Sequence, residues 1–140
     1  MNPGLTTGEQ WNGRRDPLLL RRILVVEDDP SSRVLLQRLL ENEGFEVLLA
    51  EDGAEGVAIA RNQRPDLVFL DLVLPNLNGF EAASILKADE ETAEIPIIAV
   101  TASWLGADSE RLYGIGFAGA IRKPFGAEEL MGTMKRVLSN

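Results

Sequence analysis

The stretch Ile23-Leu-Val-Val-Glu-Asp-Asp-Pro30 joins four apolar residues directly to three carboxylates and a proline. An unbroken apolar run of this length is typical of a short strand that is covered on both faces. Asp29 is placed to cap a following helix, and Pro30 suits the first position of that helix. The stretch therefore predicts a buried strand that leads at once into a helix, with acidic residues at the junction.

Outward from this stretch, the same alternation continues along the chain. Later apolar runs predict strands over residues 45–49, 67–70, 95–100 and 117–121, with a helix expected after each one. Buried strands separated by helices run parallel, with right-handed crossovers, and they require helices on both faces of the sheet. The predicted fold class is therefore α/β: a doubly wound, five-stranded parallel sheet in three αβα layers, a (βα)5 arrangement.

The predicted helices carry local start and stop signals. Asp52 with Glu55, and Asn78 with Glu81, have the spacing of capping boxes, and Gly44 is placed to end the first helix. The fourth helix, over about 105–114, is weak because two glycines limit it. The residues expected to face the core are Leu35, Leu36, Leu39 and Leu40 in the first helix, Val57 and Ala58 in the second, Phe80, Ala83 and Leu86 in the third, and Leu130, Met134, Val137 and Leu138 in the last.

The length and composition are those of one ordinary globular domain. The chain has 140 residues, 45% of them hydrophobic and 26% charged, and a net charge of -8. This charge argues against nonspecific binding to nucleic acid or to an anionic membrane, and no apolar run approaches the roughly 20 residues of a membrane helix. We expect residues 1–21, which lack an apolar period, to form a flexible tail, and residues 22–140 to form the domain.

Two residue types are missing from the composition. The chain contains no cysteine, which excludes disulfide and thiolate chemistry and suits a reducing cytoplasm, the compartment that we expect. It also contains no histidine, which excludes a serine-type triad, an imidazole metal site and an internal phosphohistidine. If the chain takes part in phosphoryl transfer from a phosphohistidine, that residue must therefore belong to another protein.

Polar side chains stand where the predicted strands end. Glu27 and Asp28 follow the first strand, Asp71 ends the third, Thr101 the fourth and Lys123 the fifth. In an open parallel sheet, ligands bind beyond the carboxyl ends of the strands, where the strand order reverses. Taken singly, each residue has an ordinary explanation, such as a loop acid or a surface lysine. Their joint occurrence at strand ends indicates one site.

The expected site combines clustered carboxylates with one hydroxyl and one ammonium group. Clustered carboxylates repel each other, and a hard divalent cation relieves this repulsion. An all-oxygen set without imidazole favours Mg²⁺, or Mn²⁺, over zinc. With the cation bound, Asp71 can attack a phosphoryl group and form an aspartyl phosphate, while the cation and Lys123 neutralise charge on the transferring group.

Four motifs carry a resemblance to a known family. They are the opening stretch from Ile23 to Pro30, Leu70-Asp-Leu-Val-Leu-Pro-Asn-Leu-Asn-Gly-Phe80, Ala99-Val-Thr-Ala102 and Arg122-Lys-Pro-Phe125. With these motifs in this order, residues 22–138 resemble bacterial response-regulator receiver domains of two-component systems, in the chemotaxis-type, stand-alone form. The resemblance implies a flavodoxin-like fold with the strand order 2-1-3-4-5.

The resemblance also implies a role for each residue at the strand ends. Asp71 corresponds to the phosphoacceptor, Thr101 to the switch hydroxyl and Lys123 to the lysine that pairs with the phosphate. Asp28 corresponds to a direct metal ligand, whereas Glu27 corresponds to an acid that acts mainly through water. The resemblance therefore implies Mg²⁺-dependent phosphorylation of the chain.

Some positions near this site complete or depart from the family pattern. The backbone carbonyl of Val73 would complete the metal ligands, and the Lys123–Pro124 peptide is expected to be cis. Ala120 stands where the family often has an aromatic switch residue. The apolar Val73 side chain cannot orient an attacking water, and Ser103 offers only a short polar group. We therefore hypothesise a comparatively long-lived aspartyl phosphate.

The resulting hypothesis is a response regulator that is not a turnover enzyme. It accepts its phosphoryl group from a sensor histidine kinase or a histidine phosphotransfer protein. The phosphate recruits Thr101 and Lys123 and shifts an existing equilibrium of the fourth helix and the loop before it. The resemblance implies output through the fourth helix, fifth strand and fifth helix. Because no DNA-binding or catalytic domain follows, we expect protein–protein contact or phosphorelay.

Three alternatives stay open at this point. A receiver-like interaction module would bind partners without being phosphorylated. An aspartyl-phosphate phosphatase would share the strand-end nucleophile, but such enzymes usually need a second Asp two residues later, where this chain has Val73. A flavodoxin-like flavin carrier is disfavoured because the loop after the first strand lacks a Ser/Thr-rich phosphate-binding turn.

Overall fold

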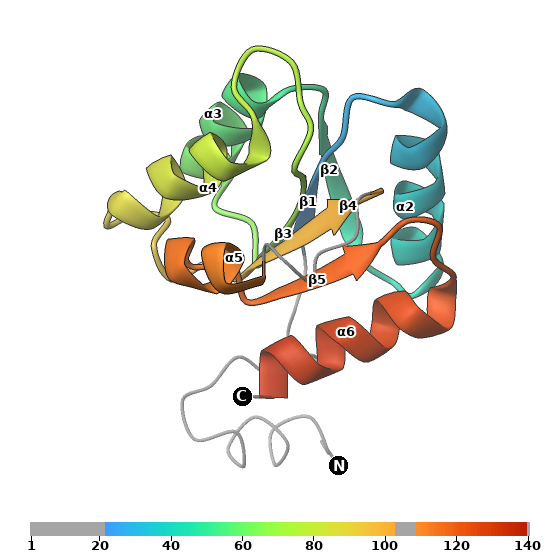
Figure 1. The fold of residues 1–140 in the computed structure, drawn as a ribbon. Helices are drawn as coiled ribbons and strands as arrows, with labels where there is room; N and C mark the ends of the chain where they lie inside the picture. Colours follow the sequence, from blue (N-terminus) through green and yellow to red (C-terminus); the bar gives the residue numbers. More distant parts are fainter. Residues whose placement is uncertain (1–21, 103–108, 140) are drawn as a thin grey trace, which may run out of the picture.

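The computed structural model describes residues 22–102 and 109–139, which form a parallel sheet flanked by helices (Figure 1). The predictions for residues 1–21, for Ser103 and for the beginning of the fourth helix lie outside these ranges. Among the described helices, none has the length and apolar character needed to span a bilayer. In chain order the elements are β1 (Arg22–Val26), α2 (Pro30–Asn42), β2 (Glu46–Ala50), α3 (Gly53–Gln63), β3 (Leu67–Asp71), α4 (Gly79–Ala88), β4 (Ile97–Thr101), α5 (Ser109–Ile115), β5 (Gly119–Arg122) and α6 (Ala127–Ser139).

The strand order of the sheet is β2-β1-β3-β4-β5, and all neighbouring pairs are parallel. This confirms the doubly wound α/β class and the predicted order. Val26 pairs with Leu70, and Asp71 pairs with Val100, so the last residues of β1, β3 and β4 lie at one edge of the sheet. The strand order reverses between β1 and β3, and ligands of such sheets bind at this position.

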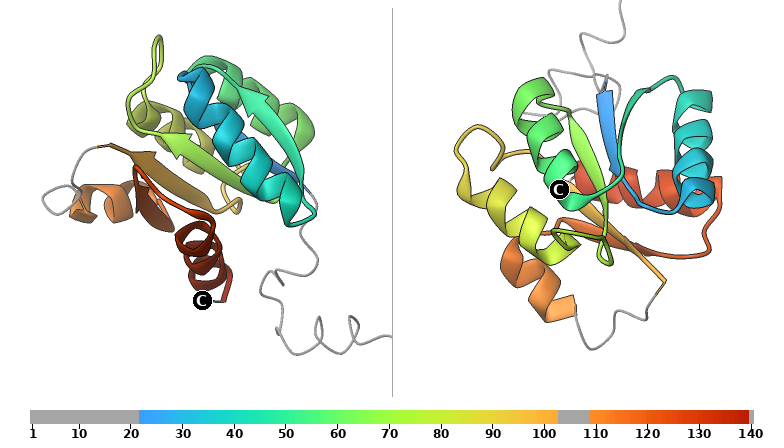
Figure 2. Two further views of the ribbon diagram at one scale, coloured as in Figure 1. Left: turned by 90° about the vertical axis from the view of Figure 1, so that its right-hand side faces the viewer. Right: turned by 90° about the horizontal axis from the view of Figure 1, so that it is seen from above.

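The helices cover both faces of the sheet (Figure 2). Side chains of one strand alternate between the two faces, so each buried strand contributes to two cores. Leu24 and Leu70 belong to the core beneath α3, α4 and α5. Ile23 and Phe69 belong to the core beneath α2 and α6. Burial on both faces explains why these strands read as unbroken apolar runs.

Local hydrogen bonds begin the helices α2, α3 and α4 at the predicted residues. At α3 only half of the predicted capping box forms, because Asp52 accepts from the Glu55 N–H but the Glu55 carboxylate accepts from the Glu51 N–H. Asp29 caps α2, because its carboxylate accepts a hydrogen bond of 2.9 Å from the Ser32 N–H. Asn78 and Glu81 form the reciprocal bonds of a capping box at the start of α4. Gly44 follows α2 with a φ of 97°, in the left-handed region that favours glycine. These signals depend on neighbours in sequence, which made them predictable.

Two residues expected in the core are exposed instead. Leu35 is 44% exposed, whereas Leu36 and Leu40 are buried. Ala58 is also exposed, although its neighbour Val57 is buried. Consecutive helical residues point in directions about 100° apart, so a narrow contact with the sheet buries only one of each pair. The predicted apolar stripes were therefore too wide.

Three strands begin later than predicted: β2 by one residue, at Glu46, and β4 and β5 by two residues each. β4 begins at Ile97, because Pro96 has no N–H to contribute to the ladder. β5 begins at Gly119, because the Phe117 N–H donates to the carbonyl of Leu112 and so belongs to the end of α5. In β4 and β5, the apolar run therefore starts before the residues that pair in the sheet.

Candidate functional site

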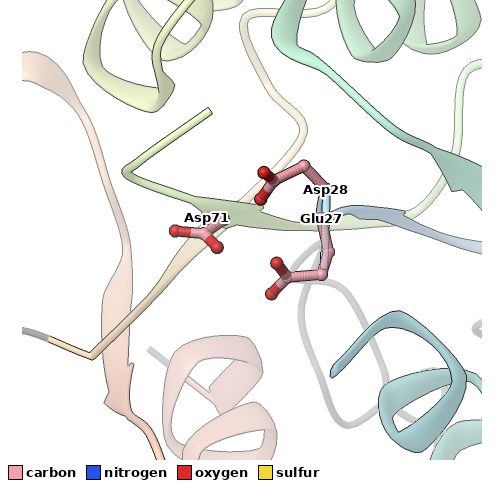
Figure 3. Close-up of side chains that lie close together, drawn as sticks. All are labelled: Glu27, Asp28 and Asp71. Carbon is pink, nitrogen blue, oxygen red and sulfur yellow. The ribbon is translucent and has the colours of Figure 1, made fainter. Parts of the chain in front are cut away.

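Three carboxylates converge at the carboxyl edge of the sheet (Figure 3). Glu27 and Asp28 come directly after β1, and Asp71 is the last residue of the adjacent strand β3. One oxygen from each residue lies within 4.8 Å of the others. The structure thus brings together three of the residues that the sequence singled out.

A single ammonium group neutralises part of this acidic cluster. Lys123, the residue after β5, donates a hydrogen bond of 3.0 Å from Nζ to Asp71 Oδ2. The same Nζ lies 2.7 Å from Glu27 Oε1. The Lys123 N–H donates to the carbonyl of Thr101 at 2.7 Å, which joins the ends of β4 and β5. The Lys123–Pro124 peptide is cis, as the resemblance implied.

Glu27 is the most buried acid of the site, with 1% of its surface exposed. Its Oε2 accepts a hydrogen bond of 3.1 Å from the Asp29 N–H. Burial, reinforced by the nearby Asp71, raises the pKa of Glu27 to about 7, although Lys123 opposes the rise. Burial would lower the pKa of Lys123, but its contacts with Glu27 and Asp71 outweigh this effect and raise it. The pKa of Glu27 and the pKa of Lys123 therefore each depend on the charge of the other residue.

The donor set fits a hard divalent cation. Glu27 Oε1 is buried, and the ammonium group of Lys123 lies 2.7 Å from it. Asp28 is exposed at the rim, and the three clustered carboxylates offer oxygen atoms only. One lysine cannot neutralise three clustered carboxylates, and a cation such as Mg²⁺ would relieve the repulsion that remains.

Backbone contacts hold Asp71 closely. It is 5% exposed, and its Oδ1 accepts a hydrogen bond of 2.9 Å from the Val73 N–H. The first residue of α4, Gly79, donates its N–H to the carbonyl of Leu72 at 3.2 Å. A Cβ at Gly79 would lie 2.3 Å from the Asp71 carbonyl oxygen, so only glycine fits there without a shift. The end of β3 is therefore held close to the start of α4.

The other predicted residues surround the acids. Thr101, the last residue of β4, is buried at the same edge, while the Val73 side chain is 71% exposed beside Asp71. Ala120 lies in β5 and packs against the core beneath α3, α4 and α5, so no aromatic ring occupies that position. The open hollow at the site is lined by Glu27, Asp28, Asp29, Asp71, Val73, Ala102 and Lys123.

Arg33 also contacts the site, which was not predicted from the sequence. Its Nη1 donates hydrogen bonds to the carbonyls of Glu27, at 2.9 Å, and Asp28, at 3.2 Å. An available signal was a cation close to the N-terminal end of a helix, where the helix dipole disfavours positive charge. The apolar pattern of this helix does not contain that signal, which comes from its charged residues alone.

The model of the response regulator receiver domain family matches residues 23–135. The chain belongs to this family. It is therefore a receiver domain of two-component signalling, a family of regulators that accept phosphoryl groups. The sheet order and the acidic edge described above are consistent with this membership.

Several known proteins align with this receiver domain over nearly their whole length. It is 40% identical to Protein PilH of Pseudomonas aeruginosa over 122 residues, which are 86% of this chain and 99% of PilH. The structure of the chemotaxis response regulator CheY4 of Vibrio cholerae matches with a TM-score of 0.80 and 30% identity, covering 85% of this chain and 99% of that one. The receiver domain of sensor histidine kinase PA1611 from P. aeruginosa, crystallised with a magnesium ion coordinated in the active site cleft, matches with a TM-score of 0.78 and 34% identity, covering 86% and 98%.

Proposed function

We propose that this receiver domain accepts a phosphoryl group on Asp71 from the phosphohistidine of a partner protein, in a Mg²⁺-dependent reaction. The observation that carries the proposal is the convergence of Glu27, Asp28 and Asp71 with the ammonium group of Lys123. The chain has no histidine, so the donor is external: a sensor histidine kinase or a histidine phosphotransfer protein. We place this exchange in the cytoplasm.

The metal would be held by oxygen atoms of this chain. The carboxylates of Asp28 and Asp71 and the backbone carbonyl of Val73 are the proposed direct ligands, with Glu27 acting mainly through water. Mg²⁺ or Mn²⁺ would supply positive charge that offsets the negative charge of the carboxylates and the transferring phosphoryl group. The magnesium ion in the PA1611 receiver domain supports this choice.

The transfer needs no proton removal from the nucleophile. A carboxylate oxygen of Asp71 forms an O–P bond while the P–N bond of phosphohistidine breaks, and the leaving nitrogen keeps the electron pair. Lys123 already contacts Asp71 and is placed to pair with the phosphoryl oxygens. The exposed Val73 cannot serve as an acid or base, which favours a phosphoacceptor over a turnover phosphatase.

Phosphorylation would then be read out by other proteins. In this proposal the phosphate recruits the Thr101 hydroxyl and Lys123, whose main chains are hydrogen-bonded to each other. That recruitment shifts an equilibrium of α5. The face formed by α5, β5 and α6 would contact the downstream protein, or the phosphoryl group would pass onward in a phosphorelay.

Incubation with a small phosphodonor, with and without Mg²⁺, tests the proposal by intact mass. We expect a single phosphoryl addition that requires Mg²⁺ and is absent in Asp71→Asn. Asp66→Asn is the matched control, because Asp66 lies at the other end of β3, where it accepts a hydrogen bond from the Arg22 N–H. A protein that stays unmodified would instead be an interaction module. Continuous release of phosphate from an added ester would favour the phosphatase.

A further inference from the structure

Arg33 on α2 reaches back to the backbone of both acidic residues that follow β1. One guanidinium nitrogen, Nη1, bridges the carbonyls of Glu27 and Asp28 at 2.9 and 3.2 Å. Arg33 is partly buried, and so is its hydrogen bond to the Glu27 carbonyl, whereas its hydrogen bond to the Asp28 carbonyl is exposed. Two consecutive peptide units that carry the acidic pair are thus held by one cation.

The position of Arg33, in the first turns of α2, does not stabilise this helix. The N-terminal end of a helix carries partial positive charge, and a cation there is unfavourable by roughly 0.3–1 kcal/mol. The start of α2 is already capped by Asp29, which accepts from the Ser32 N–H. Arg33 therefore requires compensation from other groups, and the two carbonyls beside the acidic cluster provide it.

Other hydrogen bonds fix the rest of this short segment. The Glu27 N–H donates to the carbonyl of Ala50 at 3.0 Å and so extends the sheet ladder. The Asp29 N–H donates to Glu27 Oε2 at 3.1 Å. The carbonyls of Glu27 and Asp28 accept hydrogen bonds from Arg33. Arg33 therefore adds a direct connection from α2 to both peptide units.

We infer that Arg33 is a positioning residue for the metal site. It holds the peptide units after β1 so that the carboxylates of Glu27 and Asp28 face Asp71 despite their mutual repulsion. The inference rests on the proposed function, because that function requires a divalent cation at this site. Groups that orient metal ligands commonly contribute 10–100-fold to affinity, and we expect an effect of about tenfold here.

The test is a direct titration of purified protein with Mg²⁺, without phosphodonor. We expect Arg33→Met to raise the Mg²⁺ dissociation constant about tenfold, and Arg33→Lys, which keeps a charged donor, to restore most of the affinity. Arg38→Met is the matched control, because Arg38 is an exposed residue of the same helix and its loss changes the net charge equally. The control should bind Mg²⁺ like the wild type, because distant exposed charges are screened.

A second readout separates positioning from a general structural role. At saturating Mg²⁺, the phosphorylation rate of Arg33→Met should return close to the wild-type rate, whereas at low Mg²⁺ it should lag. An unchanged dissociation constant in folded Arg33→Met would overturn the inference, as would equal weakening by Arg38→Met. If Arg33→Met does not fold, the same titration of Arg33→Gln decides, and wild-type affinity there overturns the inference. A wild type that binds Mg²⁺ but is never phosphorylated contradicts the proposed function alone.

Discussion

Lys123 Nζ donates a hydrogen bond of 3.0 Å to Asp71 Oδ2, although the two residues are 52 positions apart in the chain. The same nitrogen lies 2.7 Å from Glu27 Oε1. One cation therefore compensates two largely buried carboxylates, which come from two different strands. Without a bound metal, the charge balance of the described site depends chiefly on this lysine.

Removal of that ammonium group should destabilise the metal-free protein. We expect Lys123→Met to lower the free energy of unfolding by about 2–3 kcal/mol at pH 8, because two buried carboxylates would lose their partly buried partner. Urea unfolding in the presence of a chelator measures the change. Lys135→Met, on the exposed face of α6, should have little effect. Equal losses in the two variants would mean that Lys123 has no special role.

The raised pKa of Glu27 predicts a dependence of stability on pH. A shift from 4.5 to about 7 means that the folded, metal-free protein binds an extra proton between these values. The contribution of Glu27 therefore favours folding below pH 4.5 and is lost as the pH rises through about 7, by at most about 3 kcal/mol. Glu27→Gln should remove this contribution and stabilise the metal-free protein at pH 8.

Urea unfolding at several pH values between 4 and 8 checks this expectation. The free energy of unfolding is measured for chelator-treated wild type, Glu27→Gln and Glu90→Gln. Glu90 is an exposed acid, so its variant should keep the pH profile of the wild type. If Glu27→Gln also followed the wild-type profile, Glu27 would not titrate as described. Added Mg²⁺ should stabilise the wild type more at pH 8 than at pH 5, because its ligands bind the cation as carboxylates.

The exposed Val73 predicts a long-lived phosphorylated state. Its side chain adjoins Asp71 but offers no polar atom to orient a water molecule. We expect Val73→Asn to accelerate dephosphorylation roughly tenfold, less than full acid–base catalysis would give, because an amide only positions water. The decay of the phosphorylated mass with time measures the rate. Val73→Ala controls for the loss of the valine, and equal decay of all three proteins would contradict the hypothesis.

The contact between Gly79 and the end of β3 predicts that a side chain at position 79 would lower stability and weaken Mg²⁺ binding. In Gly79→Ala, the new Cβ would approach the Asp71 carbonyl oxygen at 2.3 Å and Leu72 Cα at 2.7 Å. We expect a loss of about 2–3 kcal/mol of stability and weaker Mg²⁺ binding, because the backbone of Asp71 must move. Gly132→Ala meets no atom within 4 Å in α6 and should instead stabilise the protein by up to about 1 kcal/mol. Unfolding midpoints of the two variants should thus shift in opposite directions.

Local interactions made much of the fold predictable. The apolar run before Asp71 required a strand covered on both faces, and the spacing of Asn78 and Glu81 required a helix start. The exposure of Leu35 was not predictable in this way, because the orientation of α2 against the sheet decides which leucine faces the core. The strand order came from the family resemblance rather than from any local pattern.

The sequence determined where the acidic residues would gather, because the carboxyl ends of parallel strands meet at one edge of the sheet. Tertiary structure alone decided how those residues interact. The depth of Glu27, its raised pKa and its contact with Lys123 depend on strands that are distant in the chain but packed together. The bridge from Arg33 depends on the angle at which α2 leaves the sheet. Burial and charge pairing are properties of neighbours in space, and a list of residues does not specify those neighbours.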